Sequence, residues 1–411
     1  MHRPELVLPA GDLEKLKTAL LFGADAVYLG GKDFSLRAFA GNLTLPEIAA
    51  GLTYAHERGK KVYIAVNILA HNRDIDSLPP YLEELQQLGV DGLIISDPGV
   101  MRLAKKYAPS IPVTVSTQAN VSNYESAAFY QDLGAVRVVL ARELTLDEIA
   151  HIKRQVEIEL EIFVHGAMCV SYSGRCLLSH YMAGRSANQG ACAHPCRYKY
   201  SVVEEKRPGQ YYAIEEDERG SYIFNSRDLC LLEYLPQLID VGVNAFKVEG
   251  RMKSPLYVAS VARIYRQVID LYVNQGHTGT DQEIKGWMEE LWAVATRPFT
   301  NGFVEGESPL IQDVSRQEMP RRTDFCGMVK GYHLDRGMVE IEQRNNFGPG
   351  DSLQFMVPDG QIIDLQLQEL FDAEGNPLDR ARHPRQKVFI PFDQLVIEDS
   401  ILRRAGERHE E

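Results

Sequence analysis

Short apolar segments recur along residues 1–275 at spacings too long for hairpins, and a segment with helical periodicity follows each of them. Apolar runs that alternate with amphipathic helices are typical of parallel βα units. The eight segments expected to be strands are LVL at Leu6, AVYLG at Ala26, KVYIAVN at Lys61, GLIISD at Gly92, PVTVST at Pro112, VRVVLA at Val136, LEIFVHG at Leu160 and AFKVEGR at Ala245.

Helix boundaries are also marked between these strands. Thr44 and Thr145 stand where N-caps are expected, because a threonine hydroxyl can accept from the first free backbone N–H groups of a helix. Glycine, which tolerates the left-handed conformation, stands where C-caps are expected at Gly23, Gly59, Gly89 and Gly134. Five helices are therefore predicted near Asp12, Thr44, Leu78, Glu125 and Thr145.

Eight parallel strands that each feed a helix match the count of a (β/α)8 barrel, and the burial and handedness rules for parallel strands favour a closed sheet. An open doubly wound sheet is the alternative. The seventh βα unit is much longer than the others, since about 80 residues separate the strand at Leu160 from the strand at Ala245. We predict an α/β fold with a TIM-like barrel over residues 1–315 and an insertion at 165–224 after strand seven.

The sequence pattern changes from helical to strand-like beyond the helical stretches at 255–275 and near Trp287. Strand-like pieces separated by Gly, Pro and Asp turns begin at Asp324 and read FCGMVKGY, GMVEIEQ, DSLQFMVP, IIDLQLQEL and KVFIPF. Such spacing is typical of antiparallel structure. We predict a small C-terminal antiparallel β-barrel domain over residues 324–405, separated from the first domain by the arginine-rich segment SRQEMPRRTD.

Composition is that of an ordinary folded protein, with 45% hydrophobic and 25% charged residues. The N-terminus shows no long apolar segment behind a basic start, and no stretch approaches the length of a membrane span, so a cytoplasmic protein without membrane contact is expected. The formal net charge of −13 argues against indiscriminate attraction to polyphosphate. Contact with nucleic acid would depend on local basic patches such as Arg380, Arg382, Arg385 and Lys387.

Four of the six cysteines fall within 28 residues, at Cys169, Cys176, Cys192 and Cys196. Thiolates are the soft ligands that iron-sulfur clusters and zinc both prefer, and nearby glycines let the chain bend around a metal. An iron-sulfur cluster is the first interpretation. Zinc is the alternative, although structural zinc sites usually have tight ligand pairs, which only Cys192 and Cys196 form. Disulfides are disfavoured because nothing marks the chain as exported.

These cysteines follow the C-terminal end of strand seven, the face on which barrel enzymes build their active sites. Polar residues at other strand ends point to the same mouth. The candidate substrate-binding residues are Arg37, Asn67, Gln118, Arg142, His165, Glu249 and Arg251. Three arginines suit a di-anionic substrate, because a guanidinium holds a carboxylate through two parallel hydrogen bonds. Capping of neighbouring backbone is the structural alternative for each residue, and no catalytic base stands out.

The run EIFVHGAMCVSYSGRCLLSHY, which begins at Glu161, resembles the signature of the collagenase-like U-type peptidase family, U32. The resemblance extends in order through LPAGDLEKLKTALLFGADAVYLGG, SLRAFAG, VNILAHN, SDPG, STQAN, VLARELTLDEI, NQGACAHPCR, NSRDL and KVEGRMKSPLYVA. It therefore covers the barrel and the appended β-domain.

The resemblance implies a 4Fe-4S cluster on Cys169, Cys176, Cys192 and Cys196. Within the family the chain is most similar to the branch whose members hydroxylate tRNA in a prephenate-dependent and oxygen-independent way, forming 5-hydroxyuridine at the wobble position. Relatives hydroxylate a cytidine of ribosomal RNA or the ring of ubiquinone precursors. The resemblance thus implies tRNA as partner and prephenate as co-substrate, whose two carboxylates would suit Arg37, Arg142 and Arg251. Oligomeric state is not indicated.

Hydrolysis is the other class of function, which the family's name suggests. The sequence contains no HExxH zinc helix and no G-x-S-x-G elbow, and a thiolate committed to a metal cannot also act as a protease nucleophile. A third possibility is a non-catalytic cluster protein that scaffolds RNA.

Overall fold

The computed structural model describes residues 2–32, 34–35, 42–168, 227–306, 323–358 and 360–404. Within 169–226 it describes Cys176, residues 178–183, Arg185, residues 192–193, Pro195 and short strand pieces at 202–203, 211–212, 216–217 and 220–221. None of the helices in this described part combines the length and the apolar character that a membrane span requires.

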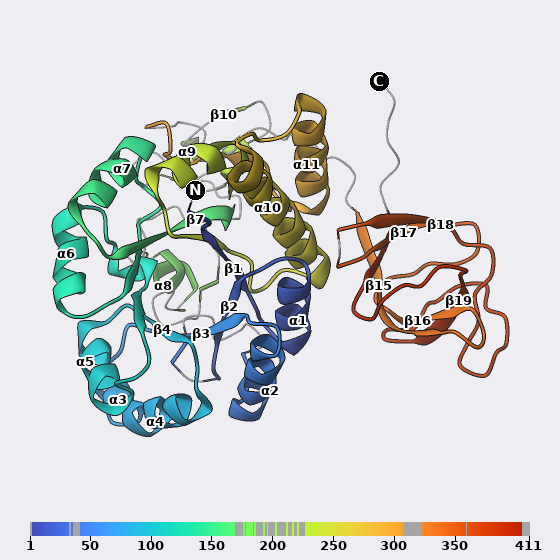
Figure 1. Cartoon of the computed structure of the whole chain (residues 1–411), viewed down its shortest axis with the longest axis horizontal. Coiled ribbons are helices and arrows are strands. Elements are labelled where there is room, and N and C mark those ends of the chain that lie inside the picture. The colour runs from blue at the N-terminus through green and yellow to red at the C-terminus, as the bar shows by residue number, and fades with distance from the viewer. Residues whose placement is uncertain are drawn as a thin grey trace.

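The first domain is a closed parallel barrel, as predicted (Figure 1). Its eight strands are β1 (Glu5–Pro9), β2 (Ala26–Gly30), β3 (Lys61–Val66), β4 (Gly92–Ile95), β5 (Val113–Val115), β6 (Arg137–Val139), β7 (Glu159–Ala167) and β13 (Ala245–Val248). Closure is explicit in the pairing, because β13 pairs in parallel with both β1 and β7. The barrel is therefore confirmed, and the open doubly wound sheet is excluded.

A ring of helices covers the outside of the barrel (Figure 1). The helices are α1 (Leu13–Leu21), α2 (Leu45–His56), α3 (Asn72–Ile75), α4 (Leu78–Leu88), α5 (Pro98–Tyr107), α6 (Tyr124–Asp132), α7 (Leu146–Gln155), α9 (Leu235–Val241), α10 (Pro255–Gln275) and α11 (Asp281–Val294). Thr44 and Thr145 each form a capping box, with Glu47 and Glu148 respectively. The four predicted C-terminal glycines all have positive φ. The sequence had not singled out α5, which Asp97 N-caps.

A two-strand extension lies beside the end of β7. The strand β12 (Asp228–Cys230) pairs antiparallel with residues 165–167, and β14 (Phe299–Thr300) adds in parallel to β12. These strands are only three and two residues long, too short to give a period-two signal in the sequence. Their effect is to brace the end of β7 just before the cysteine-rich segment.

Gly166, near the end of β7, occupies a position that only glycine fits. Its φ is +107°, and a Cβ there would lie 2.4 Å from the carbonyl oxygen of Glu249. We expect Gly166→Ala to lower the free energy of unfolding by more than the roughly 1–2 kcal/mol that left-handed backbone costs a non-glycine residue. Gly276→Ala is the matched control, since its φ is +73° and nothing lies within 4 Å. Urea midpoints that fall equally in the two variants would contradict the steric argument.

Charged side chains occupy the part of the barrel interior nearer the strand N-termini. Glu161 on β7 lies 2.6 Å from the Lys247 ammonium and 3.1 Å from the Arg137 guanidinium. Arg137 also reaches Glu5 at 2.6 Å. Burial lowers the pKa of Lys247, and the Glu161 carboxylate opposes that shift. Because Glu161 and Lys247 are 1% and 4% exposed, each charge depends on its partners for stabilisation.

The second domain is an antiparallel half-barrel, which confirms the predicted class. Its strands are β15 (Asp324–His333), β16 (Met338–Gln343), β17 (Ser352–Met356), β18 (Ile362–Gln366), β19 (Lys387–Pro391) and β20 (Ile401–Arg404), in the order β18-β17-β20-β15-β16-β19. Register shifts at two points along β15 let this long strand bend through the sheet. The sequence had not singled out the central strand β20.

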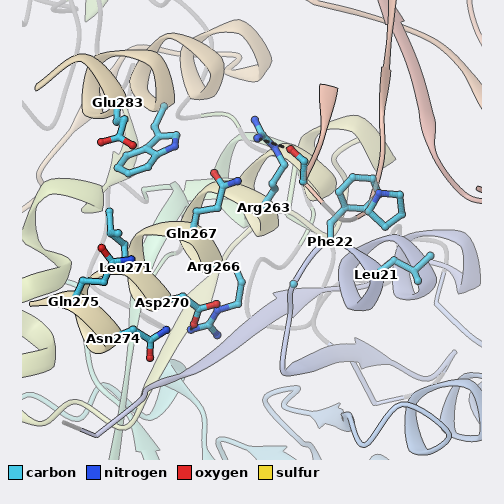
Figure 2. A pocket seen from close by; sticks show the side chains of 14 residues that line it. Leu21, Phe22, Arg263, Arg266, Gln267, Asp270, Leu271, Asn274, Gln275 and Glu283 are labelled. Carbon is cyan, nitrogen blue, oxygen red and sulfur yellow. Dashed lines mark hydrogen bonds and ion pairs between the residues drawn. The ribbon is translucent and has the colours of Figure 1, made fainter. Parts of the chain in front are cut away.

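The two domains meet along α10 and α11. Met328, Met356 and Ile401 of the half-barrel belong to the same apolar cluster as the barrel core. Glu290 on α11 accepts from Arg263 on α10 and from Arg403 on β20. A pocket of about 680 Å³ opens beside this junction, and Figure 2 shows residues of α10 in its lining together with Leu21 at the end of α1 and Glu283 on α11. Shared apolar packing and a shared carboxylate therefore couple the half-barrel to the barrel.

Candidate functional site

The candidate site is the mouth of the barrel, where the C-terminal ends of the parallel strands meet. Strand β7 ends at Ala167, two residues before Cys169. Cys169 and Cys196 lie outside the described residues, as does Arg37. The other predicted ligands and site residues can be placed individually.

The two described cysteines of the cysteine-rich run lie on segments that hydrogen-bond to one another. Helix α8 (Leu178–Ala183) begins two residues after Cys176, and its buried Ser179 hydroxyl accepts from the backbone N–H of Ala193 at 2.8 Å. Arg185 donates to the carbonyl oxygen of Cys192 at 3.4 Å. The chain therefore folds back so that the residue following Cys192 contacts the helix that follows Cys176.

The two cysteines outside this run, Cys230 and Cys326, are buried. Burial raises the pKa of the Cys230 thiol to about 11 and that of the Cys326 thiol to about 12. Both side chains pack within apolar cores, Cys230 in the barrel and Cys326 in the half-barrel. A protonated buried thiol is a poor nucleophile.

Arg142, one of the three arginines predicted at the mouth, lies beside the end of β7. Its Nη1 donates to the carbonyl oxygen of Ala167 at 2.7 Å, and its guanidinium stacks 3.9 Å from the centre of the Phe163 ring. The ammonium of Lys247 lies 5.7 Å from the same ring. The Lys247 charge is compensated by Glu161, so the Arg142 guanidinium is the cation on this ring whose planar donors suit an anionic ligand.

Amide and hydroxyl groups gather at the ends of β3 and β5. Asn67 donates to the Ser116 hydroxyl at 3.5 Å, and Ser96 donates to the carbonyl oxygen of Asn67 at 3.2 Å. Gln118 follows in a short 3-10 turn, η1 (Thr117–Ala119). Its side-chain oxygen is buried and has no hydrogen-bond partner among the described residues. A buried acceptor of this kind matches a donor on a ligand.

His165 packs into the barrel wall instead of lining an open surface. The imidazole is 1% exposed, lies 3.2 Å from the Tyr265 hydroxyl, and contacts the rings of Tyr257 and Phe299. Tyr265 donates its single hydroxyl hydrogen to the carbonyl oxygen of Val164, so Nδ1 of His165 donates to Tyr265. Burial, aided by the positive charge of Lys253, lowers the pKa of His165 to about 3. The ring is therefore neutral and braces β7 against α10.

Glu249 and Arg251 follow β13 and tie neighbouring loops together. The backbone N–H of Glu249 donates to the carbonyl oxygen of His165, and the Tyr257 hydroxyl donates to the carbonyl oxygen of Glu249. Arg251 is 4% exposed and donates to Ser35 at 2.9 Å and to Asn42 at 2.5 Å. Arg251 thereby holds both ends of the loop after β2, the loop that carries Arg37.

The structure thus brings Arg142 to the end of β7 and Arg251 to the β2 loop. It places Asn67 and Gln118 just after the C-terminal ends of β3 and β5. Sequence reasoning missed Ser35, Asn42, Ser116 and Lys247. No short sequence motif marks these residues. Ser35 and Asn42 become polar partners only because the fold places Arg251, more than 200 positions away, between them. Together the groups offer cationic, amide and hydroxyl contacts around the start of a cysteine-rich segment.

Two family models match most of the chain, and several named proteins are similar to it. Peptidase family U32 matches residues 11–312, and Peptidase family U32 C-terminal domain matches residues 321–403. The tRNA hydroxylation protein P1 of Bacillus subtilis is 40% identical over 403 residues, covering 98% of this chain and 95% of that protein. A 23S rRNA 5-hydroxycytidine synthase of Escherichia coli is 38% identical over 67% of this chain and 40% of that protein. A collagenase of Porphyromonas gingivalis is 31% identical over 99% of both chains.

Proposed function

The chain belongs to peptidase family U32, and from that membership we propose that it is an RNA-modifying hydroxylase that acts on tRNA. The observation that carries the proposal is the 40% identity, over 98% of this chain, to a protein named for tRNA hydroxylation. We further propose that the product is 5-hydroxyuridine at the wobble position, that prephenate is the co-substrate, and that the reaction does not use molecular oxygen.

We propose that a 4Fe-4S cluster is held by Cys169, Cys176, Cys192 and Cys196. The donor set fits, because four thiolates are what such a cluster requires. Support also comes from the hydrogen bonds that join the segments of Cys176 and Cys192 through Ser179 and Arg185. A cluster with four protein thiolates would supply electron transfer at the barrel mouth.

The residues around the mouth have distinct proposed roles. Arg142 would hold a carboxylate of the co-substrate above Phe163, with Arg37 as a second cation. Asn67 and Gln118 would read the polar edge of the base, since amide groups can both donate and accept. Arg251, Glu249 and His165 would position these groups through the contacts described above, holding the β2 loop, the end of β13 and the end of β7.

Replacing Arg142 by Met is expected to lower tRNA hydroxylation about 10- to 100-fold, because a charged hydrogen bond contributes about 1.5–3 kcal/mol. Arg142→Lys keeps the charge and loses the two-pronged geometry, so partial activity is expected. The measurement is mass spectrometry of tRNA nucleosides from cells that carry each variant, with iron content determined in parallel. Arg336→Met, at an arginine that is 64% exposed in the half-barrel, is the matched control. Unchanged modification in Arg142→Met would remove Arg142 from the site.

The proposed function itself is tested by tRNA nucleoside analysis of a strain that lacks its own tRNA-hydroxylating U32 protein, with and without this chain. Return of 5-hydroxyuridine derivatives supports the proposal. Return of 5-hydroxycytidine in ribosomal RNA instead would move the substrate to another RNA base. Absence of any restored hydroxylated nucleoside, with the chain expressed and folded, would overturn the proposal.

The collagenase relative makes peptide hydrolysis a second candidate. The described cysteines outside the cysteine-rich run do not support it, because burial raises the pKa of the Cys230 and Cys326 thiols. Cleavage of denatured collagen by purified protein that retains its iron, abolished by Cys176→Ser, would favour this candidate.

A further inference from the structure

A second cleft opens on the mouth side of the barrel, next to the site already described. We call it the Phe34 cleft. It has a volume of about 760 Å³ and is lined by Gly31, Lys32, Phe34, Leu43, Thr44, Leu45, Ile48, Ile68, Asp74, Ser77, Pro80, Tyr81 and Glu84. These residues follow β2, follow β3 or begin α2 and α4, so the cleft lies at the C-terminal ends of two barrel strands. Its size is that of a small-molecule or nucleotide site.

Two aromatic rings form part of its wall. The rings of Phe34 and Tyr81 lie 5.3 Å apart and are tilted by 43°. The Tyr81 hydroxyl sits so close to the loop after β2 that a Cβ on Gly31 would lie 2.1 Å from it. Tyr81 therefore supports this loop from below, while Phe34 extends the aromatic surface. The buried aliphatic residues Leu43 and Ile48 also line the cleft.

Phe34 is held in an unusual backbone conformation. Its φ is +60°, in the left-handed region that aromatic residues rarely adopt. Such a conformation costs about 1–2 kcal/mol relative to ordinary backbone. The neighbouring Ser35 is fixed by its hydrogen bond from Arg251. The fold therefore maintains a strained residue that contributes a ring to a cleft, a pattern common at ligand sites.

The rim of the cleft carries charges of both signs. Its lining includes the exposed Lys32 and the carboxylates of Asp74 and Glu84, of which Asp74 also accepts from the backbone N–H of His71. An ammonium suits a phosphate, whereas carboxylates accept from the amino groups and ring N–H groups of a nucleobase. Aromatic rings add a stacking surface that every base can use. The combined chemistry is that of a nucleotide site.

We propose that the Phe34 cleft holds an unpaired nucleobase of the RNA substrate, adjacent to the base that is modified, stacked against Phe34 and Tyr81. This inference rests on the proposed function. Chemistry on a base requires its removal from the stack, which costs a few kcal/mol and leaves its neighbours without a stacking partner. Stacking on a protein aromatic ring returns about 1–3 kcal/mol per base. A stacking surface beside the mouth would therefore offset part of the cost of presenting the target.

The test compares RNA binding by variants of the purified full chain loaded with its metal, using a synthetic tRNA anticodon stem-loop as probe. Phe34→Leu keeps apolar volume and removes the ring, so we expect the Kd to rise about 5- to 100-fold. Phe34→Tyr keeps the ring and should bind within about twofold of the wild type. Phe129→Leu, at a phenylalanine that is 55% exposed on α6, is the matched control and should bind like the wild type. Equal affinity of Phe34→Leu and the wild type would overturn the proposal.

Crosslinking of the wild-type protein gives a measurement that does not depend on any substitution. An anticodon stem-loop with 4-thiouridine beside the target nucleotide should crosslink to the peptides that contain Phe34 or Tyr81. Crosslinks confined to other parts of the chain would overturn the proposal. If the wild-type protein binds no RNA, the proposed function is overturned as well. If the wild-type protein binds RNA and Phe34→Leu binds it with the same affinity, only this inference is overturned.

Discussion

Replacing Glu161 by Met is expected to lower the free energy of unfolding by about 3–5 kcal/mol, because removing one partner of a buried ion pair leaves an uncompensated charge. Glu161 is 1% exposed and is the carboxylate nearest the Lys247 ammonium, at 2.6 Å. Lys247 is itself 4% exposed, so water cannot replace the lost partner without opening the barrel. The measurement is the shift of the urea unfolding midpoint of the barrel.

A double substitution separates the lost pair from the lost volume. Glu161→Met combined with Lys247→Met removes both charges. We expect this double variant to be less destabilised than Glu161→Met alone, because well-packed apolar groups can replace a buried ion pair at little cost. Arg137 keeps Glu5 and Glu159 as partners in this variant. Glu289→Gln, which alters an exposed pair with Lys285, is the control and should change stability by less than about 0.5 kcal/mol. A double variant as unstable as the sum of the single variants would contradict the argument.

The barrel could be predicted from the sequence because its strands are buried apolar runs and several of the helices between them have readable caps. Thr44 shows why this works, since its capping box with Glu47 is entirely local. The long helix α10 was also predicted over its full length, and in the structure Ser254 caps its start and Gly276 ends it. Short pieces carry no such signal, and β12 and β20 emerge only from pairing with β7 and β15.

The location of the site was predictable, whereas the direction of its side chains was not. Parallel strands bring their C-terminal ends together, so Asn67, Gln118 and Arg142 could be placed at one mouth from their positions alone. His165 shows the limit of period-two reasoning. Alternation from Glu161 through Phe163 would turn His165 inward, but the register between β7 and β13 shifts at Val164, and the imidazole faces Tyr265 on α10 instead.

Distant partners explain why the role of Arg251 could not be deduced from the sequence. A lone arginine after a strand suits a carboxylate ligand as well as it suits internal polar groups. In the fold its two Nη atoms reach Ser35 and Asn42 on either side of the loop that carries Arg37. The same arginine can therefore control substrate binding by fixing that loop, without touching the substrate.

Replacing Cys192 by Ser is expected to abolish the proposed activity, with a loss of at least about 100-fold, since losing even an outer partner of a metal ligand costs about 10- to 100-fold. The substitution preserves side-chain size and leaves the backbone contacts of this segment with Ser179 and Arg185 in place. Iron and acid-labile sulfide should both fall in anaerobically purified protein, because a hydroxyl does not replace a thiolate as a soft ligand.

Cys326→Ala provides the control for that loss, because Cys326 is buried in the core of the half-barrel and is not part of the cysteine-rich run. It should retain its iron, its sulfide and tRNA hydroxylation in cells, with a modest loss of stability from the small cavity. Wild-type protein that contains zinc and no sulfide would replace the iron-sulfur proposal with the zinc alternative. Full iron and sulfide in Cys192→Ser would remove Cys192 from the ligand set, and the hydrogen bond that joins its segment to α8 would then serve only to fold the insertion.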